Sequence, residues 1–283
     1  MKNRSPPNPQ LLYSFKLAGL PGTYGHLLQE IARSITWQED RWKVNHDSQE
    51  IQLLGDTECE RTQWLRETLL QEKEKGTFHL LSLWTGESCP VYDPTGDLVL
   101  SIERIAAPLF GVVTYGVQLL AYTEKDEELH VWIARRAQTK RTFPGMLDST
   151  VGGSLTTGET PFECLVREAK EEASFDAAFT RSTAIAVGAI SYLCLTDDRS
   201  KGEKGLLCPE IQFTYEMKIP ADLRPVPGDG EAEGFVLMSV DQLKEALANG
   251  EFTPANGEVV LDFFIRHGIL TFENEPNYTT IVS

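Results

Sequence analysis

The sequence has few cysteines and histidines, and neither type has the spacing of a metal site or a disulfide framework. The five cysteines, an odd number without a C-x-x-C pair, are Cys59, Cys89, Cys164, Cys194 and Cys208. The five histidines are scattered along the chain. These absences argue against a disulfide-stapled fold and against a zinc site. We therefore expect a reducing, cytoplasmic setting.

Long hydrophobic runs are also missing. No run reaches the roughly 18 apolar residues that a membrane-spanning helix needs, so we expect no membrane span. The opening segment MKNRSPPNPQ is basic but is not followed by an apolar stretch. A secretory signal is therefore not expected.

Positive charge is scarce. The 26 lysines and arginines face 42 aspartates and glutamates, which gives a formal net charge of −16. A surface this acidic repels nucleic-acid backbones and anionic lipids, so we expect neither as a partner. A phosphate-bearing ligand would need a local cationic patch or a bound metal ion.

Hydrophobic periodicity indicates two domains, with Pro108 and Gly111 near the boundary. Residues 1–110 are predicted to form a smaller α+β accessory domain. Its expected elements are a strand and turn followed by a helix over His26–Arg33, a helix over Asp56–Leu70, and a hairpin over Val91–Arg104.

Residues 111–283 show strand-like runs interspersed with helical segments, which predicts a mixed domain of sheet and helices. Strands are expected within residues 115–137, 184–195, 210–219 and 234–240, and helices at 241–250 and 259–268.

A glutamate-rich helix is expected to begin near Pro161, because Thr160 suits the N-cap and Glu163 suits the third helical position. At 100° per residue, the helix has an apolar face with Val166 and Ala169. Its acidic face carries Glu168, Glu171 and Glu172.

The three clustered carboxylates repel one another unless a cation lies between them. Mg²⁺ or Mn²⁺ would serve, because both prefer carboxylate and water oxygens. The alternative is an ordinary solvated surface helix, which is common among glutamate-rich helices.

The loop before the helix favours the metal-binding interpretation. The stretch Gly153-x5-Glu159-x7-Arg167-Glu168-x2-Glu171-Glu172 resembles the signature motif of the Nudix hydrolases, which cleave organic diphosphates. The resemblance implies an α+β fold built as an α/β/α sandwich.

The resemblance also implies residue roles. Glu168, Glu171 and Glu172 would bind Mg²⁺ (or Mn²⁺), and one of them would orient or deprotonate the attacking water. Gly153 would allow a tight backbone turn and direct its carbonyl to a metal. Glu159 would pair with Arg167 and brace the loop against the helix.

Two positions depart from the motif. Ser174 stands where a glycine is usual, and Ala169 stands where a larger aliphatic residue is usual. A serine in the left-handed conformation expected at this helix end costs about 1 kcal/mol. Neither change removes a carboxylate, so catalysis is expected to be intact.

Segments outside the motif are similar to the fungal and plant Nudix proteins called thiamin pyrophosphokinase-related. They are LFGVVTYGVQLLAY, WIARRAQTKRTFPGMLDSTVGG and EEASF. This resemblance implies hydrolysis of thiamin diphosphate, or of its oxo and oxy analogues, to the monophosphate. Gln118 stands where that group commonly has a histidine, and we assign it to substrate binding.

The densest basic run of the chain lies just before the motif and is expected to bind a diphosphate. Its members are Arg135, Arg136, Lys140 and Arg141. Glu210 is a candidate additional metal ligand, although a partly buried strand-end glutamate is the commoner explanation.

Alternatives remain open at this stage. The substrate is expected to be a small-molecule diphosphate, but a prenyl or nucleoside diphosphate is an alternative to thiamin diphosphate. A non-catalytic binding module on the Nudix fold is a third possibility. The oligomeric state is left as monomer or homodimer.

Overall fold

The computed structural model describes residues 12–125, 128–140, 142–198 and 202–282. The chain divides into two compact units. The first consists of Met1–Tyr115, Ser154–Thr160 and Ser191–Ile211, and the second of Gly116–Gly153, Pro161–Ile190 and Gln212–Ser283. The first unit thus includes residues 111–115 and two later segments in addition to residues 1–110, and the proposed boundary at 110/111 stays a prediction.

The first unit contains a four-stranded sheet in the order β2-β1-β4-β3. Its strands are β1 (Leu12–Leu17), β2 (Gly25–Leu28), β3 (Trp42–Asn45) and β4 (Glu50–Leu53). Alternate residues of β1 are buried, and they pack with Ile51 and Leu53 of β4 in one hydrophobic core. This alternation is typical of a sheet with one covered face.

Two helices accompany these strands, α1 between β2 and β3 in the chain and α2 after β4. Helix α1 spans Gln29–Ser34, so the expected helix over His26–Arg33 is wrong at its start. His26 belongs to β2, where it pairs with Ser14 of β1. The ladder hydrogen bonds outweigh the helical pattern there.

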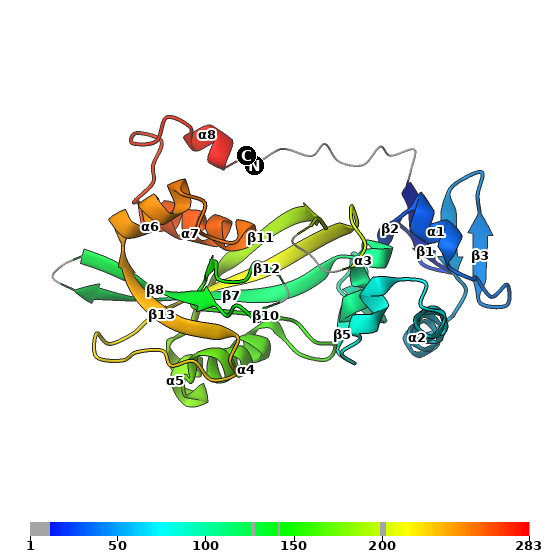
Figure 1. Ribbon diagram of the computed structural model, residues 1–283, viewed down its shortest axis with the longest axis horizontal. Coiled ribbons are helices and arrows are strands. Elements are labelled where there is room, and N and C mark those ends of the chain that lie inside the picture. The colour runs from blue at the N-terminus through cyan, green and yellow to red at the C-terminus, as the bar shows by residue number, and fades with distance from the viewer. Residues whose placement is uncertain (1–11, 126–127, 141, 199–201, 283) are drawn as a thin grey trace. The chain divides into compact units, whose positions relative to one another are not determined.

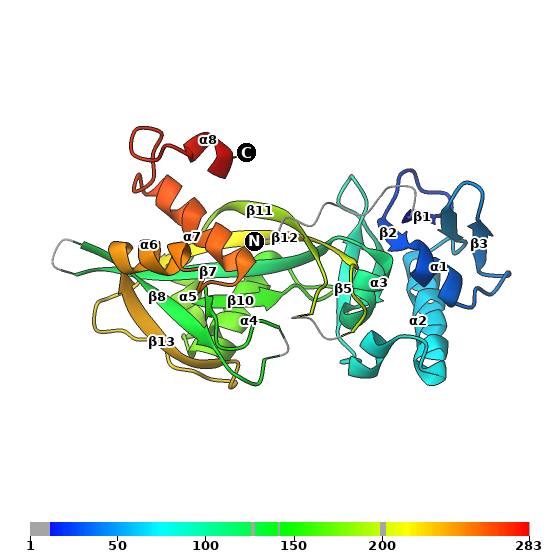
Figure 2. The ribbon, with the colours of Figure 1, turned by 45° about the horizontal axis from the view of Figure 1, so that its top comes forward.

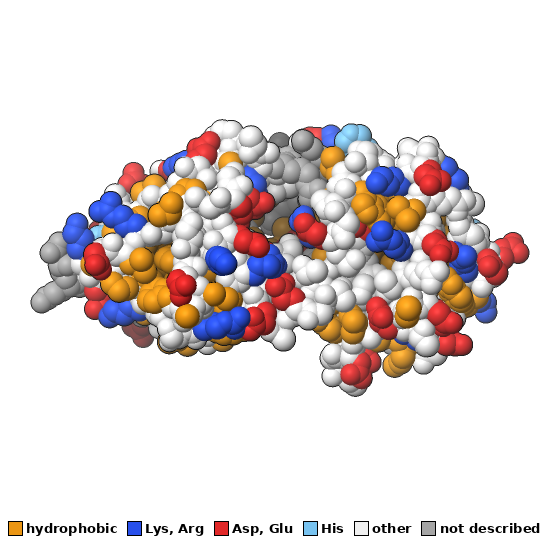
Figure 3. All heavy atoms as spheres, turned by 90° about the horizontal axis from the view of Figure 1, so that it is seen from below, with side chains coloured by type: hydrophobic (Ala, Val, Ile, Leu, Met, Phe, Trp, Pro, Cys, Tyr) orange, Lys and Arg blue, Asp and Glu red, His pale blue; other side chains and the backbone are white. Residues whose placement is uncertain are grey.

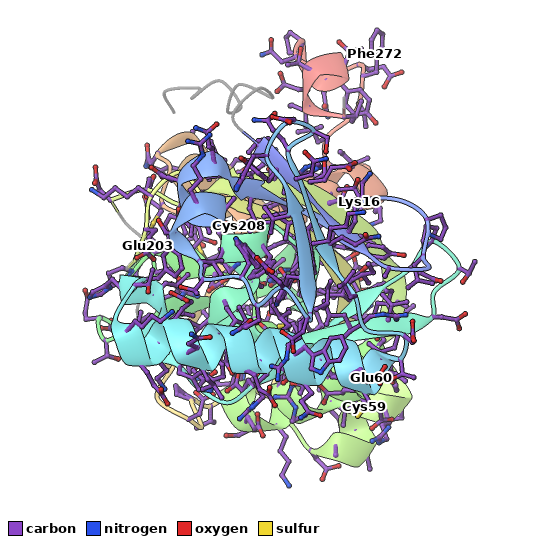
Figure 4. All side chains as sticks on the ribbon, turned by 90° about the vertical axis from the view of Figure 1, so that its right-hand side faces the viewer. Lys16, Cys59, Glu60, Glu203, Cys208 and Phe272 are labelled. Atoms are coloured by element: carbon purple, nitrogen blue, oxygen red, sulfur yellow. The ribbon has the colours of Figure 1, made fainter. Side chains whose placement is uncertain are left out.

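Helix α2 (Glu58–Lys75) confirms the helix expected over Asp56–Leu70 and extends it. Thr57 and Glu60 form a capping box at its start. The helix ends at Gly76, whose φ of 69° suits glycine. Figure 4 shows α2 side-on, with Cys59 and Glu60 labelled at its start.

The remaining elements of this unit are short. Strands β5 (Ser88–Tyr92) and β6 (Leu98–Glu103) form the expected hairpin. The other elements are η2 (His79–Leu83), η3 (Arg104–Ala106) and α3 (Ala107–Phe110).

A seven-stranded sheet has the order β11-β12-β7-β8-β13, with β10 beside β7 and β9 beside β8. The long strands are β7 (Thr114–Lys125), β8 (Glu128–Arg136), β11 (Ile185–Leu195), β12 (Leu207–Lys218) and β13 (Ala232–Ser239). The short ones are β9 (Leu147–Asp148) and β10 (Val151–Ser154). All four strand regions expected beyond residue 111 are confirmed.

In the second unit, helices lie on both faces of this sheet. Helices α6 (Val240–Ala248) and α7 (Pro254–Arg266) cover one face, and α4 (Pro161–Ala173) and α5 (Ala177–Thr183) lie on the other (Figures 1 and 2). The expected α+β fold is therefore confirmed. The last helix, α8, spans Tyr278–Ile281.

Helix α7 begins earlier than the expected start at residue 259. Thr253 caps it by accepting a hydrogen bond from the Asn256 amide, and Pro254 occupies the first turn. None of the described helices is both long enough and apolar enough to cross a bilayer.

Candidate active site

Helix α4 carries the glutamate cluster and begins at Pro161, as expected. Five side chains anchor it to the sheet: Cys164, Leu165, Val166, Ala169 and Ala173 are all buried. The small Ala169 is fully buried, so a larger aliphatic residue at that position would have no space without repacking. The apolar face thus fixes the orientation of the acidic face.

The end of α4 confirms the expected left-handed residue. Ser174 has a φ of 55°, a conformation that costs a serine about 1 kcal/mol. The loop before β13 covers this helix end: the Val226 amide donates to the Ala173 carbonyl at 3.0 Å, and the Gly228 amide donates to the Glu172 carbonyl at 3.2 Å. These bonds satisfy carbonyls that the helix itself leaves without partners.

Strand β10 lies directly against the acidic face of α4. A Cβ atom on Gly153 would stand 2.2 Å from the carboxyl carbon of Glu168. The Gly152 amide donates to Glu172 Oε2 at 2.9 Å. Gly153 lies within β10, so the close approach of Glu168, and not a tight turn, is what requires glycine there.

The two inner carboxylates of α4 have raised pKa values. Burial raises the pKa of Glu168 to about 7, against the opposing effect of Arg167. Burial also raises the pKa of Glu172 well above its usual range, and the nearby charges of Glu168 and Asp148 add to this, although the Gly152 hydrogen bond lowers it. Carboxylates held this way attract a cation, because ionising them without one is costly.

The third carboxylate of the cluster is more open. Glu171 is half exposed and accepts a hydrogen bond from Arg167 Nη1 at 3.1 Å. The same nitrogen donates to Glu168 Oε1 at 2.7 Å. Arg167 therefore bridges two of the three acids. Its expected pairing with Glu159 stays a prediction.

The loop before β13 adds two acids that the motif does not contain. Oxygen atoms of Glu172, Asp229 and Glu231 all lie within 4.8 Å of one another. Oxygen-only donor sets with several carboxylates suit Mg²⁺ and Mn²⁺, so these residues fit such an ion. Asp229 and Glu231 lie far along the chain from the motif, so no spacing connects them with it. Their only signal in the sequence is a short acidic stretch in a glycine-containing loop.

Two of the expected substrate-binding cations reach this site. Arg136 pairs with Asp148 at 2.5 Å and donates to the Thr142 carbonyl, and Lys140 pairs with Glu231. Both line a small pocket together with Glu172. Its cavity volume of about 20 Å³ has room for a single water or ion.

Arg135 and Arg141 are the other expected substrate contacts, and Glu210 is the expected additional metal ligand. Arg135 donates to the Gly145 carbonyl at 2.8 Å and is not among the described residues of the pocket wall. Arg141 lies outside the described residues. Glu210, in the first unit, accepts a hydrogen bond from the Tyr192 hydroxyl at 2.6 Å, and its role as a ligand stays a prediction.

Gln118 is buried behind the pocket wall. It accepts a hydrogen bond from Ser149, whose hydroxyl also reaches Asn256 Oδ1 at 2.6 Å. Asn256 in turn donates to Asp148, the partner of Arg136. This buried position suits support of the wall better than direct contact with a substrate.

Figure 3 shows the face of the second unit that carries α4 and α5. Acidic and basic side chains are interspersed over it, although the chain as a whole is strongly acidic.

Comparison with known proteins identifies relatives of this chain. The model of the NUDIX domain family matches residues 114–262, more than half of the chain. An uncharacterized protein of Saccharomyces cerevisiae is 36% identical over 71% of this chain and 60% of its own length. Nudix hydrolase 20, chloroplastic, of Arabidopsis thaliana is 39% identical over 62% of this chain and 45% of its own length.

The chain thus spans about half the length of the curated relatives that it matches. A crystal structure from Deinococcus radiodurans aligns with a TM-score of 0.45 at 22% identity, covering 62% of this chain and 98% of that one.

Proposed function

Because the chain belongs to the Nudix family, we propose that it is a divalent-metal-dependent hydrolase that cleaves an organic diphosphate to the monophosphate and phosphate. The observation that carries this proposal is the acidic face of α4. Its partly buried Glu168 and Glu172 lie against the glycines of β10, and Glu172 lies beside the acids of a second loop. In an ordinary surface helix the carboxylates stay in water, because removing like charges from water together costs free energy.

We assign Glu168, Glu171, Glu172, Asp229 and Glu231 to holding Mg²⁺ or Mn²⁺, with the Gly153 carbonyl as a further oxygen donor. When bound, such an ion neutralises phosphate oxygens and lowers the pKa of a coordinated water. The hydrogen bond from the Gly152 amide fixes the Glu172 carboxylate relative to β10.

The remaining residues orient the reactants and move a proton. Arg167 holds Oε1 of Glu168, and Oε2 is the atom that we propose receives the proton of the attacking water. Arg136 and Lys140 would exchange part of their contacts with Asp148 and Glu231 for phosphate oxygens.

For the organic group we propose thiamin diphosphate or its oxo and oxy analogues. The support is the similarity of the segments flanking the motif to thiamin pyrophosphokinase-related Nudix proteins. A prenyl or nucleoside diphosphate is the alternative substrate. The cytoplasmic setting, the small-molecule partner and the open choice of monomer or homodimer stay predictions.

A substrate panel tests this function. The protein is incubated with thiamin, prenyl and nucleoside diphosphates, with Mg²⁺ and with EDTA, and phosphate release is measured. We expect release from thiamin diphosphate that depends on Mg²⁺. Faster turnover of another diphosphate would replace the proposed substrate. No release from any of them would leave the binding module as the better interpretation.

A further inference from the structure

The start of helix α7 is fastened to strand β9, which borders the candidate active site. The Leu147 amide donates to the Glu251 carbonyl at 2.9 Å, and the Thr253 amide donates to the Leu147 carbonyl at 3.0 Å. Helices α7 and α4 lie on opposite faces of the sheet (Figures 1 and 2). These bonds nevertheless bring Asn256, in the first turn of α7, to Asp148 at the end of β9.

Asn256 uses both polar atoms of its buried side-chain amide. It is 5% exposed, and its Oδ1 atom lies 2.6 Å from the Ser149 hydroxyl. Its Nδ2 atom donates to Thr253 Oγ1 at 2.8 Å and to Asp148 Oδ1. The Ser149 amide donates to the same oxygen of Asp148 at 3.1 Å. Two donors therefore hold one oxygen of Asp148 and fix the orientation of its carboxylate.

The other oxygen of Asp148 holds Arg136. Asp148 Oδ2 pairs with Arg136 Nη1 at 2.5 Å. On its other edge, the guanidinium donates to the Thr142 carbonyl from Nε at 3.2 Å and from Nη2 at 2.8 Å. The Arg136 side chain is 16% exposed and lines the pocket together with Glu172. Because a guanidinium is planar, fixing it along two edges leaves it a single orientation.

We propose that Asn256 is a positioning residue for diphosphate binding, because it fixes Asp148 and Asp148 in turn fixes the guanidinium of Arg136. This inference rests on the proposed function, in which Arg136 binds phosphate oxygens. An arginine that is oriented before the substrate arrives loses little freedom on binding, so the affinity is higher. Asn256 is not among the described residues that line the pocket, and all of the residues in this chain of contacts belong to the second unit.

The Asn256 side chain is not needed to cap α7. The Asn256 backbone amide donates to Thr253 Oγ1 at 3.4 Å, and alanine at position 256 would keep this bond. Asn256→Ala therefore removes the side-chain donor to Asp148 and leaves the backbone part of the cap in place. This substitution separates the positioning of Arg136 from the formation of the helix.

The first measurement needs no substrate. Nitrogen-15 NMR follows the Nε–H group of Arg136, whose signal is assigned by its loss in Arg136→Lys. In Asn256→Ala this hydrogen should exchange with water at least about tenfold faster than in the unmodified chain, because Asp148 holds the guanidinium less firmly. An unchanged exchange rate in the folded variant would overturn the proposal.

The second measurement is a double-mutant cycle on binding of methylenediphosphonate, an uncleavable diphosphate, with Mg²⁺ by isothermal titration calorimetry. Asn256→Ala alone should raise Kd about five- to tenfold. In the Arg136→Lys background it should change Kd by less than about twofold, since no planar guanidinium remains to be oriented. Additive effects of the two substitutions would show that Asn256 does not act through Arg136.

The two measurements distinguish this inference from the proposed function. No binding of methylenediphosphonate to the unmodified chain would overturn the assignment to diphosphate binding and count against the proposed function. Tight binding with additive effects would overturn the positioning role alone.

A control variant matches the loss of a capping side chain in the same unit. Ser239→Ala removes the side chain that caps α6, so it should lower stability without changing Kd or the exchange of Arg136. Thermal unfolding shows whether each variant is folded. Should Asn256→Ala fail to fold, Asn256→Ser takes its place, because serine suits the first turn of a helix but is too short to reach Asp148; the same exchange and binding results are expected.

Discussion

Helices α2 and α4 are both rich in glutamate, yet their carboxylates have opposite environments. In α2, hydrogen bonds from Gln63 and Arg41 lower the pKa of Glu67. In α4, burial raises the pKa values of Glu168 and Glu172. Sequence composition alone does not distinguish these helices. What differs is the effect that dominates each pKa: hydrogen bonds dominate at Glu67, whereas burial dominates at Glu168 and Glu172 despite the donors Arg167 and Gly152.

The pKa of Glu72 in α2 shows the clearest contrast with that of Glu172. The Glu72 side chain is as buried as a core residue. Burial alone would raise the pKa of Glu72, but hydrogen bonds from Thr77, Lys75 and the Thr36 amide outweigh it and the pKa is lowered. Glu72 therefore stabilises the fold, whereas Glu172 is held at a cost that a bound cation would offset.

The largest expected effect is that of Glu172→Gln on turnover. The substitution keeps an oxygen for the Gly152 amide but removes a charge from the candidate metal site, so we expect a loss of roughly 10²–10³-fold in kcat. Without metal, the variant should unfold at a higher temperature than the unmodified chain at pH 7, because a carboxyl with a raised pKa destabilises the fold when ionised.

Calorimetry with and without Mg²⁺ separates the two effects. Mg²⁺ should raise the Tm of the unmodified chain and leave Glu172→Gln nearly unchanged. Glu163→Gln on the same helix is the control, since Glu163 pairs with Arg181 at the surface. Full activity of Glu172→Gln would remove Glu172 from the site.

Gly153→Ala should have the next largest effect. The new methyl group would stand 2.2 Å from the Glu168 carboxyl and would push that side chain off β10. We expect kcat to fall by about ten- to a hundredfold, because small displacements in a site of this kind are costly. Gly234→Ala in β13 is the matched control, since a Cβ there meets nothing within 4 Å. Equal activities of both variants would show that Glu168 needs no fixed position.

Much of this site could be predicted from the sequence, because the helical period places Glu168 and Glu172 on one face whatever the tertiary structure. The start of α4 at Pro161 and the left-handed Ser174 also follow from local rules. Asp229 and Glu231 could not be predicted, since loop packing against the end of α4 brings them to Glu172.

In the fold, too, features set by local rules could be predicted from the sequence, whereas features set by contacts between distant residues could not. The hairpin of β5 and β6 was predictable from its turn residues, and it is present. The error at His26 arose because pairing with β1, a contact between distant residues, decides its conformation. The burial of Gln118 likewise depends on Ser149 and Asn256, which no local pattern connects.

Glu72→Gln should act on stability and leave hydrolysis unchanged. Removing the charge weakens hydrogen bonds from Lys75 and the Thr36 amide inside the first unit, so we expect a loss of about 1–3 kcal/mol in unfolding free energy. The measurement is urea unfolding at pH 7, with Glu74→Gln as the exposed control on the same helix.

The lowered pKa of Glu72 also predicts how the stability difference between the unmodified chain and Glu72→Gln changes with pH. Because the folded pKa of Glu72 is lowered, its contribution is present above the ordinary value of 4.5 and is lost as pH falls through the folded pKa. The difference in stability between the unmodified chain and Glu72→Gln should therefore shrink on going from pH 6 to about pH 3. A difference that grows on acidification would contradict the lowered pKa.

The smallest expected effects concern how the two helices end. Helix α2 ends in Gly76, with a φ of 69°, whereas α4 ends before Ser174, with a φ of 55°. Ser174→Gly should stabilise the protein by about 1 kcal/mol, and Gly76→Ser should destabilise it by a similar amount, because only glycine adopts this conformation without strain. Urea unfolding measures both. Opposite and equal shifts would show that the strain lies in the backbone. A loss of stability in Ser174→Gly would mean instead that the serine side chain, which lies near Gly228, contributes more to the end of α4 than its strained backbone costs.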